Sequence, residues 1–278
     1  MLIIHRQFDR AIVPVLLVLA LAAGISCQRI AVLTPERSPL TDAFTNALQR
    51  ALDNKFNVLD AGLAAAAYDS IKVDTPFNQT IETAQRIGAV IGSDHFLLIK
   101  TDVSRRTASS RPLYYEASAF VWIVNSRTGG MIGWLQSAKQ GSTASEAESS
   151  LMRAVSETAE EIESSIKTAP TFEAAAEFEM FDPDSKTLRP AMPYKRIKPE
   201  YTSTAYLFDV KATVEVIVSI DEKGIVRHIE ITRWAGFGLD ASVVDAIRKM
   251  NWRAGERNGK PLPMRVLLRY NFTKIEKE

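Results

Sequence analysis

The most regular pattern in the chain is an alternation of apolar and polar residues over positions 210–220. A period of two places every second side chain on one face, so this stretch predicts a β-strand with one buried face. Its apolar positions are Val210, Ala212, Val214, Val216, Val218 and Ile220. A turn at residues 221–224, where Gly224 suits a positive φ, predicts that residues 225–234 pair back as a hairpin.

A helix and a last strand complete this C-terminal pattern. We expect Asp240 to cap the helix N-terminus, because an aspartate there can accept hydrogen bonds from free backbone N–H groups. The apolar positions that follow at helical spacing are Val243, Val244, Ile247 and Met250. An Asn-Gly turn at residues 258–259 leads into residues 264–272, which alternate again.

Residues 29–167 mix the two periods and predict a sheet flanked by helices. The expected strands are 30–33, 56–59, 95–100, 114–124 and 131–140. The expected helices are 40–52, 61–67, 80–91 and 144–166. Thr143 and Glu146 form a capping box at the start of the last helix. The order is β-α-β-α-α-β-β-β-α, so the fold class is a mixed α/β domain followed by a small α+β domain with an antiparallel sheet and one main helix.

The first 27 residues have the pattern of an export signal or membrane anchor. His5, Arg6 and Arg10 precede sixteen uncharged residues, 11–26, which end at Cys27. Three interpretations stay open: a lipoprotein signal with Cys27 as the lipidated N-terminus, an uncleaved membrane segment, or a signal cleaved after Ala22. Sixteen residues make a helix of about 24 Å, which is short of the bilayer core. All three place residues 28–278 outside the cytoplasm, facing the periplasm in the cell envelope.

Composition narrows the class of protein. The 46% hydrophobic and 24% charged content is that of a globular protein, and a net charge of +1 gives no reason to expect nucleic acid as a partner. The charge is divided unevenly: residues 28–185 carry 14 basic and 21 acidic side chains, and residues 186–278 carry 18 and 11. We therefore expect domains at 28–167 and 190–278, joined by a linker at 168–189.

The N-terminal domain resembles an envelope domain found in CsgG-type, LpoB-type and TolB N-terminal proteins. The runs that carry the resemblance are Ile30-Ala31-Val32-Leu33, Gly92-Ser93-Asp94-His95-Phe96-Leu97-Leu98 and Val124-Asn125-Ser126-Arg127-Thr128-Gly129-Gly130-Met131. Neither the propeller of TolB nor the long hairpins of a CsgG-type pore is indicated here.

The C-terminal domain, over residues of about 190–275, is similar to the TonB C-terminal domain. The matching motifs are Pro199-Glu200-Tyr201, Ile220-Asp221-Glu222-Lys223-Gly224, Leu239-Asp240, Trp252-Arg253-Ala254 and Asn258-Gly259-Lys260-Pro261-Leu262. Two positions depart from the family pattern: Thr202 where it favours proline, and Leu262 where it has valine. The resemblance implies binding of an outer-membrane or periplasmic protein and a link to transport across the envelope.

The last strand is the expected binding element. The chain ends six residues after it, so we expect it to be an edge with unpaired backbone groups. An extended partner segment would add to this edge, as the TonB resemblance also implies, and an alternative is pairing with a second copy in a homodimer. The residues expected to set the preference are Arg265, Leu267, Arg269 and Asn271.

Catalytic chemistry is not indicated. The sequence contains no phosphate-binding loop, HExxH, CxxC or GxSxG, and Gly236-Phe237-Gly238 lacks the context of a nucleotide motif. One cysteine and three histidines predict no metal site, no cofactor and no enzyme. Tyr114, Tyr115, Phe120 and Trp122, at strand spacing, indicate core and rim packing. The alternative function is a structural or assembly lipoprotein led by the N-terminal domain, with the C-terminal domain as a docking piece.

Overall fold

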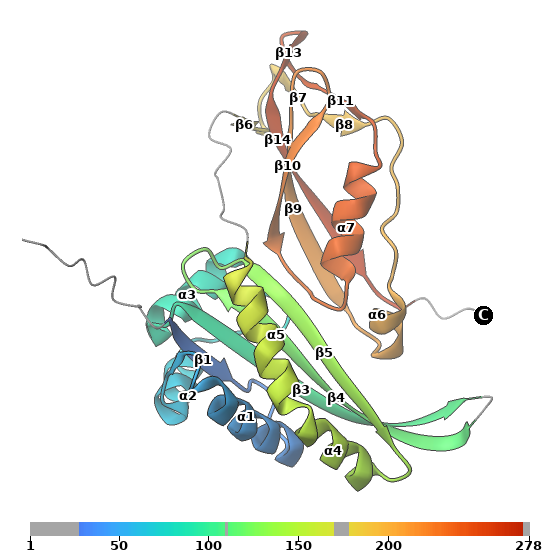
Figure 1. The fold of residues 1–278 in the computed structure, drawn as a ribbon. Coiled ribbons are helices and arrows are strands. Elements are labelled where there is room, and N and C mark those ends of the chain that lie inside the picture. The colour runs from blue at the N-terminus through green and yellow to red at the C-terminus, as the bar shows by residue number, and fades with distance from the viewer. Residues whose placement is uncertain (1–27, 109–110, 170–177, 275–278) are drawn as a thin grey trace, which may run out of the picture.

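The computed structural model describes residues 28–108, 111–169 and 178–274, which form two main sheets, each with helices packed against it (Figure 1). Among these residues no helix is both long enough and apolar enough to cross a membrane. The expected anchor, with Cys27, lies outside the described residues.

The first sheet has five strands in the order β2-β1-β3-β4-β5. β1 runs parallel to β2 and β3, and β3, β4 and β5 form an antiparallel meander. The strands are β1 (Arg29–Leu33), β2 (Asn57–Val58), β3 (His95–Ala108), β4 (Arg111–Asn125) and β5 (Met131–Gly141). β3 and β4 are longer than the patterns at 95–100 and 114–124 indicated, because their extra residues pair with each other beyond the apolar core.

Both faces of this sheet are buried. Along β3, Leu97 and Ile99 pack in one hydrophobic cluster with three of the helices, α1, α4 and α5, while Phe96 and Leu98 belong to a second cluster on the other face. The helices are α1 (Pro39–Leu52), α2 (Ala61–Asp69), α3 (Ile81–Ile91), α4 (Ala144–Arg153) and α5 (Val155–Lys167).

The capping box is present, but the single helix expected after it is two. The backbone N–H of Glu146 donates to Thr143 Oγ1 at 3.2 Å, and the Glu146 carboxylate accepts from the N–H of Ser142 at 2.9 Å. The break comes at Ala154, whose N–H bonds back to Leu151 O, a turn tighter than that of an α-helix. The apolar face continues across the break, which is why periodicity alone did not reveal it.

The second sheet has the order β10-β9-β14-β6 and packs against helix α7. Its strands are β6 (Glu179–Met180), β9 (Ala212–Ile220), β10 (Val226–Arg233) and β14 (Met264–Phe272), and α7 is Leu239–Arg248. Shorter elements complete this half: β7 (Leu188–Arg189), β8 (Met192–Pro193), α6 (Ser203–Leu207), β11 (Trp252–Arg253), β12 (Gly255–Arg257) and β13 (Lys260–Leu262). β6 and β7 lie in the segment that the sequence indicated as a linker.

The start of α7 differs from the prediction. Gly238, at φ 75°, takes the N-cap position, and Asp240 is the second residue of the helix. The Asp240 carboxylate is buried and accepts from the N–H groups of Ala235 at 3.0 Å and Gly236 at 2.6 Å. It therefore holds the loop before the helix rather than capping the helix from outside.

One hydrophobic cluster spans both halves of the chain. Phe96, Leu98, Phe120 and Trp122 of the first sheet share it with Val214, Trp234, Phe237 and Val243 of the second half. The second half lies on the side of the first sheet that faces away from α1, α4 and α5 (Figure 1). The two halves are thus packed against each other, in addition to being connected by the polypeptide chain.

Candidate functional site

β14 is an edge strand along most of its length. On one side it pairs antiparallel with β9 over all nine residues. On the other side, β6 pairs only with Met264 and Arg265, in parallel. From residue 266 to 272, no strand of the described chain pairs with the side of β14 that faces away from β9.

The backbone geometry shows which groups face this open side. The N–H of Phe181, just after β6, donates to the Arg265 carbonyl at 2.8 Å, so the Arg265 backbone points away from β9. Backbone groups alternate sides along a strand, so those of Leu267, Arg269 and Asn271 point to the open side as well. The four residues singled out from the sequence are the ones whose backbone groups face the edge.

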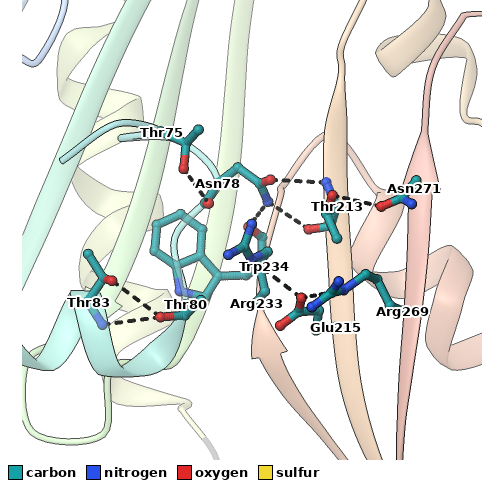
Figure 2. Close-up of polar contacts among 10 residues, drawn as sticks. All are labelled: Thr75, Asn78, Thr80, Thr83, Thr213, Glu215, Arg233, Trp234, Arg269 and Asn271. Carbon is teal, nitrogen blue, oxygen red and sulfur yellow. Dashed lines mark hydrogen bonds and ion pairs between the residues drawn. The ribbon is translucent and has the colours of Figure 1, made fainter.

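Their side chains lie on the sheet face away from α7 and are partly engaged already. Arg265 pairs with Glu230 at 2.6 Å, and Arg269 pairs with Glu215 at 2.7 Å. Asn271 Oδ1 accepts from Thr213 Oγ1 at 2.9 Å, and Leu267 is 55% exposed. Figure 2 shows Arg269 and Asn271 beside their partners on β9. The positive charges of Arg265 and Arg269 are therefore matched by carboxylates within the sheet.

A groove of about 730 Å³ runs beside this edge. The segment 190–197 and the residues at and just after the end of β6 form its far wall, and β14 forms the near one. Most of its lining is apolar: Met180, Phe181, Pro183, Pro190, Ala191, Met192, Pro193, Ile197, Ile217, Met250, Val266, Leu267, Leu268 and Tyr270. Arg196 and Arg269 are the only charged residues in that lining.

The opposite edge of the sheet, at β10, is partly covered by the first half of the chain. The Asn78 side chain donates to the carbonyls of Thr213 at 2.8 Å and Trp234 at 2.7 Å, and accepts from the N–H of Thr213 at 3.0 Å. Figure 2 shows this amide beside Thr213 and Trp234. Thr80 also forms an antiparallel bridge with Arg233. The loop at residues 75–80 thus continues the sheet at its β10 end.

Aromatic packing accompanies these hydrogen bonds. We call Phe77, Phe120, Trp122, Trp134, Phe208 and Phe237 the junction cluster, whose rings contact one another across the two halves. Phe120 lies 4.8 Å from Phe208, centroid to centroid, in an edge-to-face arrangement. Trp122 Nε1 donates to the Ala235 carbonyl and Trp234 Nε1 to the Gly129 carbonyl, both at 3.1 Å. The core packing expected of Phe120 and Trp122 is confirmed.

Sequence reasoning missed the residues that hold the halves together. Asn78 lies in a turn with no periodic pattern, and its role depends on strands more than a hundred residues away. Gly236, Phe237 and Gly238 all have positive φ, and this backbone places Phe237 in the junction cluster. The sequence signal that could have revealed this loop is the phenylalanine between two glycines, because glycine is typical of positions with positive φ.

The described residues contain no group of three or more His, Cys, Asp or Glu side chains that could hold a metal ion. His95 is buried at the start of β3, and burial lowers its pKa, which the charge of Asp94 opposes. This is the environment of a structural histidine.

Residues 197–273 match the family model for the C-terminal domain of Gram-negative bacterial TonB proteins. This segment is a TonB C-terminal domain. Its final strand, β14, is the strand with the open edge, and its longer helix is α7. No curated protein matches the chain.

Solved structures resemble each half separately. The TonB C-terminal domain of Pseudomonas aeruginosa is 21% identical and covers 34% of this chain and 94% of its own, with a TM-score of 0.26. The N-terminal half is similar to lipoprotein GNA1162 from Neisseria meningitidis, at 15% identity, 49% and 97% coverage and a TM-score of 0.35. The LpoB C-terminal domain from Salmonella enterica is 18% identical, with 43% and 88% coverage and a TM-score of 0.27. Values this low say nothing about partner or activity.

Proposed function

We propose that the protein is a non-enzymatic cell-envelope protein whose TonB C-terminal domain binds an extended segment of an outer-membrane or periplasmic partner by strand addition at β14. The observation that carries this is the open row of backbone groups on Leu267, Arg269 and Asn271, beside a largely apolar groove. The opposite edge, at β10, is bridged to Thr80 at Arg233, and the apolar groove lies beside β14 and not beside β10. The family match supports a link to transport across the envelope.

We place the protein on a membrane, facing the periplasm, through residues 1–27. The basic start, the uncharged run and the small residues before Cys27 support a lipid anchor at Cys27, with an uncleaved membrane segment as the alternative. Acyl-chain labelling of the wild type and of Cys27→Ala distinguishes the lipid anchor from the uncleaved membrane segment. Label absent from wild type, or retained in the variant, removes the lipid anchor.

A proline at position 267 tests strand addition. Its ring replaces an N–H that faces the open side and leaves the bonds to β9 in place. Random peptides displayed on phage are first selected on the wild-type chain. We expect Leu267→Pro to weaken binding of the selected peptides about tenfold or more, and Leu267→Ala, which keeps the N–H, to retain it.

Asn271→Pro is the second variant, used if circular dichroism shows that Leu267→Pro does not fold. It also removes an N–H that faces the open side. Unchanged peptide binding in a folded proline variant contradicts the proposal. Loss of binding only in variants that change the oligomeric state, measured by sedimentation, favours pairing with a second copy instead.

The alternative is an assembly protein led by the N-terminal half. The junction cluster favours this alternative, because through it the TonB C-terminal domain is already docked on the first sheet. An envelope partner that cross-links to the N-terminal half equally well in wild type and in Leu267→Pro supports this alternative.

A further inference from the structure

A second cavity, of about 720 Å³, lies at the end of the first sheet where β1 and β3 begin and β4 ends. It shares no residue with the groove beside β14. Its lining includes residues 92–95 and 125–127, which belong to two of the sequence runs that the proposed function does not use. The C-terminal half of α3 lines it as well.

This cavity has one unmatched positive charge. Arg127 is exposed, and its guanidinium forms no ion pair within the part of the chain that the structure describes. Arg29 differs, because it pairs with Asp94 at 3.9 Å and its backbone N–H donates to the same carboxylate at 2.8 Å. The N–H groups of Arg127 and Thr128 both donate to Asn125 Oδ1 at 3.0 Å, which holds the loop in place. A guanidinium in such a setting favours a phosphate or a carboxylate.

Buried polar groups line the same cavity. His95 is 6% exposed, and its Nδ1 has no hydrogen-bond partner among the described residues. Ser93 and Ser126 are each 7% exposed, and their hydroxyl oxygens lie 3.2 Å apart in a hydrogen bond to which only one of them donates. Polar groups that are buried without a full set of partners cost free energy, which a bound ligand can recover.

The cavity also offers hydrogen-bond acceptors, which a bare anion would leave unused. α3 ends at Ile91, and the last carbonyls of a helix have no partners within the helix. The Asp94 carboxylate is a further acceptor in the lining. A helix C-terminus and a carboxylate both disfavour a second negative charge. The ligand that fits carries a single negative charge together with hydroxyl groups.

The position of the cavity along the chain indicates where such a ligand could be met. Gln28 lines the cavity and directly follows Cys27 in the sequence. Consecutive Cα atoms are about 3.8 Å apart, so a lipid anchor at Cys27 places the cavity at the membrane surface. This step alone rests on the anchor proposed above.

We propose that the cavity binds a glycerophosphodiester, a singly charged phosphate that carries glycerol hydroxyl groups. The phosphate pairs with the Arg127 guanidinium. The hydroxyl groups donate to the Asp94 carboxylate and to the carbonyls at the end of α3. This chemistry has two sources, the headgroup of phosphatidylglycerol in a membrane and a free glycerophosphodiester.

The His95 ring signals in NMR spectra of the full-length protein, in a non-ionic detergent, test the proposal. Glycerophosphoglycerol, the headgroup without acyl chains, should shift these signals to saturation, and glycerol or sulfate at the same concentration should not. Arg127→Gln should weaken this binding about tenfold. Arg86→Gln is the matched control and should bind as wild type does. Arg86 is exposed on α3, has no ion pair among the described residues and does not line the cavity.

Three results overturn the proposal: no saturable shift with glycerophosphoglycerol, equally tight binding of sulfate, or equal losses in Arg127→Gln and Arg86→Gln. The last would show an effect of net charge alone.

Nanodiscs identify the source. A His95 shift in phosphatidylcholine discs that contain phosphatidylglycerol, and none in pure phosphatidylcholine discs, supports the lipid headgroup. A shift with the free diester alone supports a soluble ligand. Binding of the free diester does not depend on acylation of Cys27, so this proposal and the anchor fail separately.

Discussion

Asp240 acts at the junction between the two halves through the loop that it holds. Its carboxylate accepts from two N–H groups of that loop, and the loop carbonyl at Ala235 accepts from Trp122. Burial raises the pKa of Asp240 to about 6, although the hydrogen bonds from Ala235 and Gly236 lower it. The Leu-Asp motif at this helix start thus fixes a loop and does not cap the helix.

Asp240→Asn should alter how stability depends on pH. The folded-state pKa of about 6 lies above the ordinary value of 3.8, so the folded protein holds the proton more tightly. This stabilisation is complete below pH 3.8 and is lost as the pH rises through 6. Urea unfolding should show the free energy of unfolding of wild type, relative to Asp240→Asn, falling by about 3 kcal/mol between these limits. A difference independent of pH would contradict the assignment.

At the scale of elements, the loop at residues 234–238 joins β10 to α7, and its last three residues have positive φ. Gly236 lies where an added Cβ would come within 2.5 Å of Trp134 Cδ1 and 2.6 Å of Trp122 Nε1. Phe237, at φ 54°, holds a conformation that costs a bulky residue energy, and its ring reaches the junction cluster. Aromatic packing between the halves offsets that cost.

Gly236→Ala and Gly259→Ala form a matched pair that separates backbone strain from the clash. Gly259 has nearly the same φ, 79° against 78°, but nothing lies within 4 Å of its Cβ position. We expect Gly259→Ala to cost about 1–2 kcal/mol from strain alone, and Gly236→Ala a further 1–3 kcal/mol or so from the contact with the indoles. Thermal and urea unfolding measure both. Equal costs would show that the indoles move aside freely.

The sequence predicted the elements well and their assembly poorly. Alternation over β9 and β14 reveals strands because one face of each is buried, and the open edge was expected because β14 is the last strand of its pattern. The ion-pair partners of Arg265 and Arg269 could not be predicted from the sequence, because strand register decides that Glu230 and Glu215 lie beside them. Asn78 acts through contacts that depend on distant strands, and it does not lie in a periodic pattern.

At the scale of the whole molecule, the two halves share a core although their charge and sequence patterns differ. The face of the first sheet that carries Phe120, Trp122 and Trp134 is covered by Phe208, Phe237 and their neighbours. The expected boundary at residue 167 therefore separates two sequence patterns, and an apolar surface lies between the halves.

The fragment 28–167 should fold on its own but self-associate through its exposed apolar surface. Its sheet, α1, α4 and α5 form a separate cluster on the other face, so we expect native-like circular dichroism. The uncovered junction residues should bind a hydrophobic dye and drive association in sedimentation, which the full chain should not show. An unfolded fragment would mean that residues 28–167 are not an independent domain.

The junction also bears on how the protein is made. Trp122 and its acceptor Ala235 are 113 residues apart, and ribosomes add about 5–20 residues per second, so roughly ten seconds pass between their syntheses. Small domains fold in far less time than that. If the chain folded as it is synthesised, an indole-rich surface would be complete before its cover exists. A chain that is exported before it folds brings the surface and its cover together instead.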